Sequence, residues 1–301
     1  MNLSTVLKKI KNKISIKKNR ILNKSNFQKY VNENIPSNFI DLINFSFYQN
    51  VSKKDYAIGR NIENLRNSLA IEYKDKKIST FASPHSGTKL FNEDGSVIPG
   101  SFVESKNAGF ARTGTGIVTG IQLKKITEAI DASSIIELGT NTGLSGAYFL
   151  HAINSPHLLT IEGSSDLCKI AEKNLSLMSN KDFDVINGMF DDEIDRLFNM
   201  GKRFDLAFVD GQHEEQATLH YAEKLKSILN PGGAILFDDI FWSEGMNSAW
   251  NKVASDPDYC MSFDLGTRGL CILKEENMKT NRIKFELTNY TGKPLYNREG
   301  W

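Results

Sequence analysis

From about residue 121, two patterns of apolar residues alternate along the chain. Short apolar runs are separated by longer segments in which apolar residues recur at helical spacing. We predict strands at 134–138, 158–161, 183–186, 206–209, 234–237, 261–265 and 270–273. We predict helices at 121–130, 143–153, 166–178, 192–200 and 214–229. This alternation is typical of an α/β fold with a doubly wound, mostly parallel sheet. The last two strands flank Gly266–Gly269 and predict an antiparallel hairpin that completes seven strands.

The first 120 residues follow other patterns and predict a helical and loop extension. Residues 1–30 and the segments 39–47 and 62–71 have helical character, with the polar stretch 52–55 between the last two. From residue 80 to residue 120 glycine and proline recur, which predicts a long, lid-like loop. We therefore divide the chain into an extension (1–120), an α/β domain (121–274) and a C-terminal extension (275–301).

The N-terminal helix is basic and amphipathic. Leu3, Val6, Leu7, Ile10 and Ile14 lie on one face at helical spacing. Residues 1–30 hold nine Lys/Arg and no Asp/Glu, so the remaining residues carry 28 basic against 36 acidic side chains, a balance of −8. Such a helix can make a peripheral membrane contact or pack against a partner. A simple solvated helix is the commoner reading of a charge run.

Composition fits a soluble, cytoplasmic protein. Of 301 residues, 40% are hydrophobic and 24% charged. No apolar run approaches the ~20 residues that span a bilayer, and the N-terminus does not fit a secretory signal. Cys168, Cys260 and Cys271 lack metal-site spacing, so we expect reduced, buried thiols. Nucleic acid is not an expected partner, because no basic aromatic platform accompanies the arm. A homo-oligomer is compatible with the sequence.

Two glycines follow the first strand of the α/β domain. Gly139 and Gly143 stand where the chain turns from strand to helix, and Glu162 ends the second strand. Glycines there let the backbone approach a ligand, and a strand-end carboxylate can accept hydrogen bonds from ribose hydroxyls. An acidic residue that merely ends a strand is the alternative. The spacing departs from the dinucleotide fingerprint, and the acidic Glu137 would repel a pyrophosphate. A carboxylate there suits the cationic S-adenosyl-L-methionine better.

Three carboxylates follow the fourth and fifth strands of the sheet. Asp210 comes after one, and Asp238 and Asp239 come after the other. Strand ends of this kind border the ligand crevice of open parallel sheets. Clustered carboxylates repel one another unless a cation lies between them, and hard oxygen donors favour Mg²⁺. The alternative is that Asp238 and Asp239 cap the next segment and that Asp210 begins a turn.

Residues 120–274 resemble the class I S-adenosylmethionine-dependent methyltransferases, whose fold is Rossmann-like. The stretch Glu137-Leu-Gly-Thr-Asn-Thr-Gly-Leu-Ser145 is similar to the motif of the metal-dependent catechol O-methyltransferases. The carboxylates also resemble those of the sugar O-methyltransferases of macrolide and aminocoumarin biosynthesis. The resemblance implies one group of residues at the methionine half of the cofactor, Glu162 at the ribose and a third group at the adenine. The first group is Glu137, Gly139, Asn141, Gly143 and Ser145, and the third is Gly188, Met189 and Phe190, with Asp210 also bordering the cofactor.

The same resemblance assigns the chemistry of the site. It implies a metal, Mg²⁺, on Asp210, Asp238 and Asp239, and a catalytic base three residues beyond the first ligand, which here is His213. The expected reaction is methyl transfer to a hydroxyl of a small molecule, a sugar or a glycoconjugate. Phe241 and Trp242 could wall the acceptor site or simply pack. A metal-independent class I methyltransferase and a non-catalytic binding protein remain the alternatives.

Overall fold

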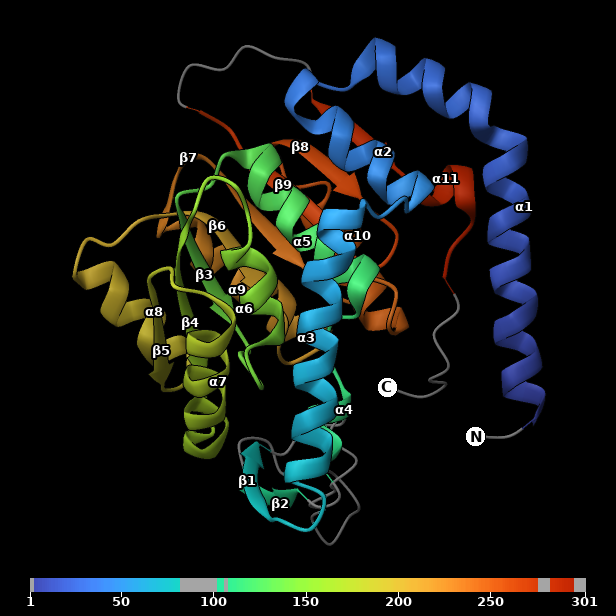
Figure 1. Cartoon of the computed structure of the whole chain (residues 1–301). Coiled ribbons are helices and arrows are strands. Elements are labelled where there is room, and N and C mark those ends of the chain that lie inside the picture. Colours follow the sequence, from blue (N-terminus) through green and yellow to red (C-terminus); the bar gives the residue numbers. More distant parts are fainter. Residues whose placement is uncertain (1–2, 82–101, 106–107, 276–281, 295–301) are drawn as a thin grey trace, which may run out of the picture. The chain divides into compact units, whose positions relative to one another are not determined.

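The computed structural model describes residues 3–81, 102–105, 108–275 and 282–294 (Figure 1). The chain divides into two compact units. One consists of Met1–Asn50 with Arg203–Trp301, and the other is Val51–Lys202. None of the described helices has the length and apolarity needed to cross a bilayer.

The Val51–Lys202 unit holds the first half of the α/β pattern. Its parallel strands lie in the order β3-β4-β5, with a separate antiparallel pair, β1 and β2. The strands are β1 (Ile78–Phe81), β2 (Phe102–Ser105), β3 (Ser134–Leu138), β4 (His157–Glu162) and β5 (Phe183–Asn187). The helices are α3 (Lys53–Glu72), α4 (Gly109–Arg112), α5 (Ile117–Ile130), α6 (Leu144–Leu150), α7 (Ser165–Met178) and α8 (Phe190–Asn199).

The other unit holds the second half of the pattern and the N-terminal helices. Its strands lie in the order β10-β8-β9-β7-β6, in which β6 and β7 are parallel and β9 runs antiparallel to both β7 and β8. The strands are β6 (Phe204–Val209), β7 (Leu229–Phe237), β8 (Tyr259–Asp264), β9 (Gly269–Leu273) and β10 (Ile283–Glu286). The helices are α1 (Leu3–Asn34), the 3₁₀ turn Ser37–Phe39, α2 (Ile40–Tyr48), α9 (Glu215–Lys226), α10 (Glu244–Val253) and α11 (Thr288–Thr291).

The predicted α/β fold, mostly parallel with an antiparallel hairpin, is confirmed. Each of the seven predicted strands is present, and most boundaries agree within two residues. The structure adds an eighth strand, β10, which pairs parallel to β8 through Phe285 and Phe263. This strand was not predicted because four residues, Ile-Lys-Phe-Glu, give too short an alternation to separate from a loop.

Some helix boundaries differ from the predicted ones, because a helix cap or strand pairing, and not the apolar spacing, sets where the element begins or ends. The helix predicted to reach Leu229 ends at Lys226, because Leu229 already pairs with Phe204 as the start of β7. The stretch from residue 80 to residue 120, expected to be a loop, contains β2, α4 and the start of α5, while residues 82–101 lie outside the described part. The polar residues at 52–55 begin α3, since Ser52 Oγ accepts a hydrogen bond from the Asp55 amide at 3.1 Å.

Candidate active site

The glycine bend after β3 requires unusual backbone conformations. Gly139 and Gly143 have φ values of +104° and +78°, and Asn141 between them has φ +48°. A Cβ on Gly143 would lie 3.1 Å from the Leu175 side chain, so the bend also packs closely on α7. The amide of Gly139 donates to the carbonyl of Ile161 at 3.0 Å. Glycine is therefore required here by conformation, as the sequence suggested.

Glu162 joins the end of β4 to this bend. Its Oε2 accepts a hydrogen bond from the Asn141 amide at 3.0 Å, and its Oε1 accepts one from the Ser164 amide at 2.9 Å. The residue is 8% exposed, and burial raises the pKa of its carboxyl group against the lowering effect of these amides. Each carboxylate oxygen can accept a further hydrogen bond. The carboxylate is thus held in place with acceptor capacity left for a diol.

Glu137 is more deeply buried than a residue that only lines a pocket. It is fully buried, and its two carboxylate oxygens accept hydrogen bonds from the hydroxyl groups of Ser145 and Thr160, the latter at 2.7 Å. Thr160 also shares a hydrogen bond with Thr140. In the structure Glu137 and Ser145 therefore tie the start of α6 to β3 and β4, an arrangement that the sequence did not indicate.

Asn141 links the bend to the segment that precedes α5. Its Nδ2 donates to the Phe110 carbonyl at 3.3 Å and to Thr113 Oγ1 at 3.2 Å. Within the described residues its Oδ1 is buried and has no hydrogen-bond partner. A buried acceptor without a donor is costly, so this oxygen is suited to an external donor such as an ammonium group.

The third predicted group, after β5, lies beside Glu162. The Gly188 amide donates to the Glu162 carbonyl at 3.1 Å, and a Cβ on Gly188 would lie 2.6 Å from the Glu193 side chain. Met189 is 46% exposed and Phe190, which begins α8, is partly buried. Met189 is therefore not a core residue, which leaves its side chain accessible to a ligand.

The three aspartates belong to the other unit, at the carboxyl ends of β6 and β7. Val209 pairs with Phe237, and the Asp238 amide donates to the Val209 carbonyl at 3.0 Å, so Asp210 and Asp238 follow neighbouring strands. Asp239 adopts φ +54°, a conformation rare outside glycine and common at functional sites.

Arg268 is a partner of this cluster that the sequence analysis missed. Its Nε lies 3.2 Å from Asp238 Oδ1 and its Nη2 lies 3.1 Å from Asp238 Oδ2, and the residue is 1% exposed. The antiparallel pair Phe237 and Gly269 sets this contact, because the next residues along the two strands are Asp238 and Arg268. Asp238 thus has a buried counter-charge from the protein itself.

His213 lies against Asp210, three residues before it in the sequence. Its Nε2 is 3.5 Å from Asp210 Oδ1, and its ring is 6.2 Å from that of Trp242. Burial lowers the pKa of His213, but Asp210 and the charges of the other aspartates outweigh it and raise the pKa to about 9.

Asp210, Asp238 and Asp239 cannot easily all carry a negative charge at the same time. Burial and the charge of Asp238 raise the pKa of Asp210, and the same two causes raise the pKa of Asp239 to about 7. These directions show an excess of negative charge in a buried place. Among the described residues no group of three or more His, Cys, Asp or Glu side chains is placed to hold a metal ion.

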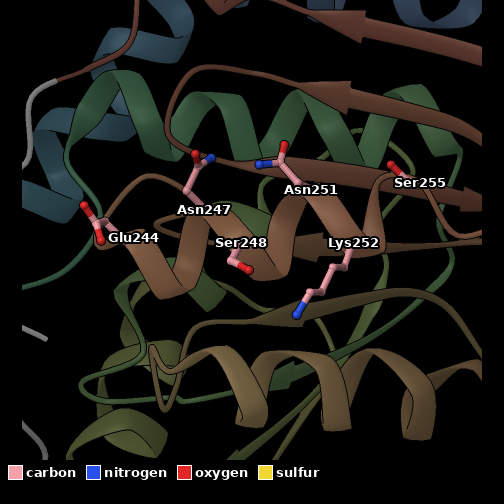
Figure 2. Close-up of a pocket in the computed structure, with 6 residues that line it drawn as sticks. All are labelled: Glu244, Asn247, Ser248, Asn251, Lys252 and Ser255. Atoms are coloured by element: carbon pink, nitrogen blue, oxygen red, sulfur yellow. The ribbon is translucent and has the colours of Figure 1, made fainter.

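A different hollow, of about 630 Å³, lies along α10 (Figure 2). Its lining residues are Glu244, Asn247, Ser248, Asn251, Lys252 and Ser255. Ser248 and Lys252 both bond to Glu215 of α9, at 2.6 and 2.7 Å, so part of its polar lining serves helix packing. None of the predicted site residues lines it, and we assign it no function.

Comparison with known proteins agrees with this domain. Residues 136–240 match the family model of a methyltransferase domain. No curated protein matches the chain in sequence. The O-methyltransferase from Bacillus cereus in complex with SAH is 16% identical, with 83% of this chain and 97% of that chain covered and a TM-score of 0.47. TomG from Streptomyces achromogenes, an O-methyltransferase of tomaymycin synthesis, is 18% identical over 54% and 82%, with a TM-score of 0.46.

A fungal protein completes this group. The SAH-bound Podospora anserina methyltransferase PaMTH1 is 16% identical over 56% of this chain and 82% of that chain, with a TM-score of 0.45. The glycine bend, Glu162 and the three aspartates all lie within the segment that matches the family model. The likeness to a methyltransferase domain is confined to residues 136–240 of the 301.

Proposed function

We propose that this chain transfers a methyl group from S-adenosyl-L-methionine to a hydroxyl group. The observation that carries the proposal is the pair formed by Glu162 and the glycine bend, in which a buried carboxylate and the Asn141 amide are locked together at 3.0 Å. The free acceptor capacity of Glu162 suits the ribose diol, and the buried Oδ1 of Asn141 suits the ammonium group of the methionine half. When bound, the cofactor supplies a methyl group on a cationic sulfur.

The aspartate cluster supports general-base chemistry at the acceptor. His213 is oriented by Asp210, and in its neutral form an imidazole so held can take the proton of a hydroxyl that attacks the methyl carbon. Because the aspartates raise the pKa of His213 to about 9, the neutral form requires either a high pH or a cation that offsets their charge. An acceptor hydroxyl bound beside His213 would have its base within reach. Such positioning of nucleophile and base provides much of the rate enhancement in transfer reactions. Asp210 acts here on His213, and only His213 would touch the reacting atoms.

We include Mg²⁺ in the proposal, and Asp210 and Asp239 are the residues that would hold it. The fit comes from the charge of the cluster, since burial and Asp238 raise the pKa of Asp239 to about 7, and a cation would relieve that repulsion. Mg²⁺ in proteins often takes only one or two carboxylates. Asp238 is the weakest of the three predicted ligands, because Arg268 already binds both of its oxygens. When bound, the metal would lower the pKa of the acceptor hydroxyl.

The acceptor we propose is a hydroxyl of a sugar or glycoconjugate, or of another small molecule. The basis is the resemblance of the carboxylate pattern to the sugar O-methyltransferases and the hydrogen-bonding character of the cluster. Phe241 and Trp242, which follow Asp239, are the candidates for its apolar wall.

Calorimetric titration with S-adenosylhomocysteine tests the cofactor half. We expect binding to the wild type and a loss of at least tenfold in Glu162→Ala, from the loss of one or two hydrogen bonds to a charged group. Asp182→Ala, an exposed acidic residue before β5, is the matched control and should bind normally. Absence of binding to the folded wild type would refute the proposal.

Methyl transfer to a panel of sugars and glycosides, with MgCl₂ or EDTA, tests the catalytic half. His213→Ala should lower kcat by roughly 10²–10⁴-fold with S-adenosylhomocysteine affinity unchanged. Asp239→Ala should abolish the dependence on added Mg²⁺. Full activity in EDTA would exclude the metal and leave the cofactor assignment intact.

A further inference from the structure

One face of helix α1 is fixed to its own unit. On that face Asn12, Asn19 and Asn23 donate hydrogen bonds to backbone carbonyls in the segment 290–293, at 3.3, 3.1 and 2.9 Å. Nearer its C-terminal end Phe27 is fully buried. Figure 1 shows α1 as a long helix with α11 beside it. These contacts fix the rotation of the helix about its own axis, and therefore which residues it turns away from the protein.

The opposite face of α1 presents an apolar stripe to solvent. We define the stripe as Leu7, Ile10, Ile14 and Ile21, which are 50%, 48%, 64% and 70% exposed. At 3.6 residues per turn these four lie within about 60° of one another and about 170° from the asparagine face. An isolated exposed apolar side chain is ordinary. These four are aligned along about four helical turns and form one continuous, exposed apolar face.

Lysines border the stripe on both sides. Lys17 and Lys24 lie along one edge and Lys11 and Lys18 along the other, by the same helical geometry, and all four are exposed. Residues 1–30 contain nine Lys/Arg and no Asp/Glu, whereas the remaining residues sum to −8. The positive charge is thus concentrated around the apolar residues.

We propose that α1 lies in the plane of an anionic lipid bilayer surface, with the stripe among the acyl chains and the flanking lysines at the headgroups. Long lysine side chains can extend their charge toward headgroup phosphates while their stems cover apolar surface. A second copy of this chain is a less suitable partner for the stripe. If two α1 helices packed together, the nine Lys/Arg of one N-terminal segment would repel the nine of the other. Nucleic acid explains the lysines but not the isoleucines between them.

Co-sedimentation of the full chain with vesicles tests this directly. We expect binding to vesicles of phosphatidylcholine with phosphatidylglycerol, much weaker binding to phosphatidylcholine alone, and weakening by salt. Ile10→Gln/Ile14→Gln should lower the partition coefficient by more than about tenfold. Lys17→Gln/Lys24→Gln should lower it by roughly 30-fold.

Matched controls separate α1 from general surface effects. Ile71 and Ile153 are 78% and 82% exposed elsewhere on the chain, so Ile71→Gln/Ile153→Gln should bind vesicles like the wild type. Lys53→Gln/Lys54→Gln is the charge control. Every variant should keep the thermal unfolding and S-adenosylhomocysteine titration of the wild type, which separates this result from the methyltransferase proposal.

Three outcomes would overturn the proposal. One is equal binding to neutral and anionic vesicles, and another is normal binding by the stripe variant. The third is a lipid-free dimer in sedimentation velocity that the stripe variant dissociates, since this would assign the stripe to a second copy of the chain.

Discussion

Replacing Arg268 by methionine should destabilise the protein strongly. Methionine keeps much of the aliphatic volume but removes the guanidinium that binds both oxygens of Asp238, at 3.2 and 3.1 Å. The side chains are 2% and 13% exposed, so the pair is buried and little screened by water. Removing one partner of a buried ion pair leaves an uncompensated charge and typically costs about 3–5 kcal/mol. We expect Arg268→Met to fall in that range.

Urea unfolding of the wild type, Arg268→Met, Asp238→Asn and the double variant measures the free energy of this interaction. Asp238→Asn removes the charge that would be stranded, so the double variant should lose less than the sum of the two single variants, with a coupling energy of about 2 kcal/mol. Arg268→Lys keeps the charge but not the two-pronged geometry and should lie between wild type and Arg268→Met. An Arg268→Met protein within 1 kcal/mol of wild type, or strictly additive effects, would show that the pair is solvated in solution and that this reasoning is wrong.

Three further predictions concern packing and chemistry elsewhere. Gly120→Ala should cost about 1–3 kcal/mol in thermal unfolding, because its Cβ would lie 2.2 Å from the Tyr148 ring, whereas Gly109→Ala, with nothing within 4 Å, should be neutral. Ser52→Ala should cost ~1 kcal/mol, because the α3 cap is lost. Ser52→Thr keeps a hydroxyl that can accept from the Asp55 amide and donate to the Asp55 carboxylate, so it should keep most of the stability; equal losses in the two variants would argue against the cap. The three cysteines are buried, so the folded chain should react with a thiol reagent only after denaturation; rapid labelling of native protein would contradict that burial.

The local structure around the proposed cofactor site could be predicted because its residues are close in sequence. Strand, glycine bend and helix are contiguous from Ser134 to Leu150, and Glu162 ends the next strand. In parallel α/β units a strand-end position is set by the apolar run that precedes it, so local pattern was sufficient. What the pattern could not supply was the role of Thr160, since a hydroxyl inside a buried strand has no periodic signature. Its bond to Glu137 exists only because β3 and β4 pair in one register.

Arg268 shows where sequence reasoning stops. It lies 30 residues from Asp238, and the contact depends on the antiparallel register of β7 and β9. Shifting that register by one residue would turn the side chain to the other face of the sheet. The hairpin could be predicted from its glycines, but the pairing of its second strand with β7 could not. The guanidinium, which the sequence did not predict, occupies both carboxylate oxygens of Asp238, one of the three aspartates predicted to hold a metal.

Asp264 gives a prediction about pH that also rests on an interaction invisible in the sequence. It is 1% exposed at the end of β8 and accepts hydrogen bonds from the Gly266 amide at 2.7 Å and from Thr288. Burial raises its pKa to about 6, and these hydrogen bonds offset only part of that effect. The folded state therefore favours the protonated form relative to the unfolded chain, where the pKa is about 3.9.

The sign of the pH effect follows from this difference. Between about pH 4 and pH 6 the folded state binds more protons at Asp264 than the unfolded chain does. The free energy of unfolding is therefore higher at the acidic end of this range and falls as the pH rises. Two pKa units correspond to roughly 3 kcal/mol. Asp264→Asn, which is neutral at every pH, should match the wild type in urea unfolding near pH 4 and exceed it by up to that amount near pH 7.5. Asp182→Asn is the exposed control. If the difference between wild type and Asp264→Asn stayed constant across this range, Asp264 would titrate alike in both states, and its raised pKa would be disproved.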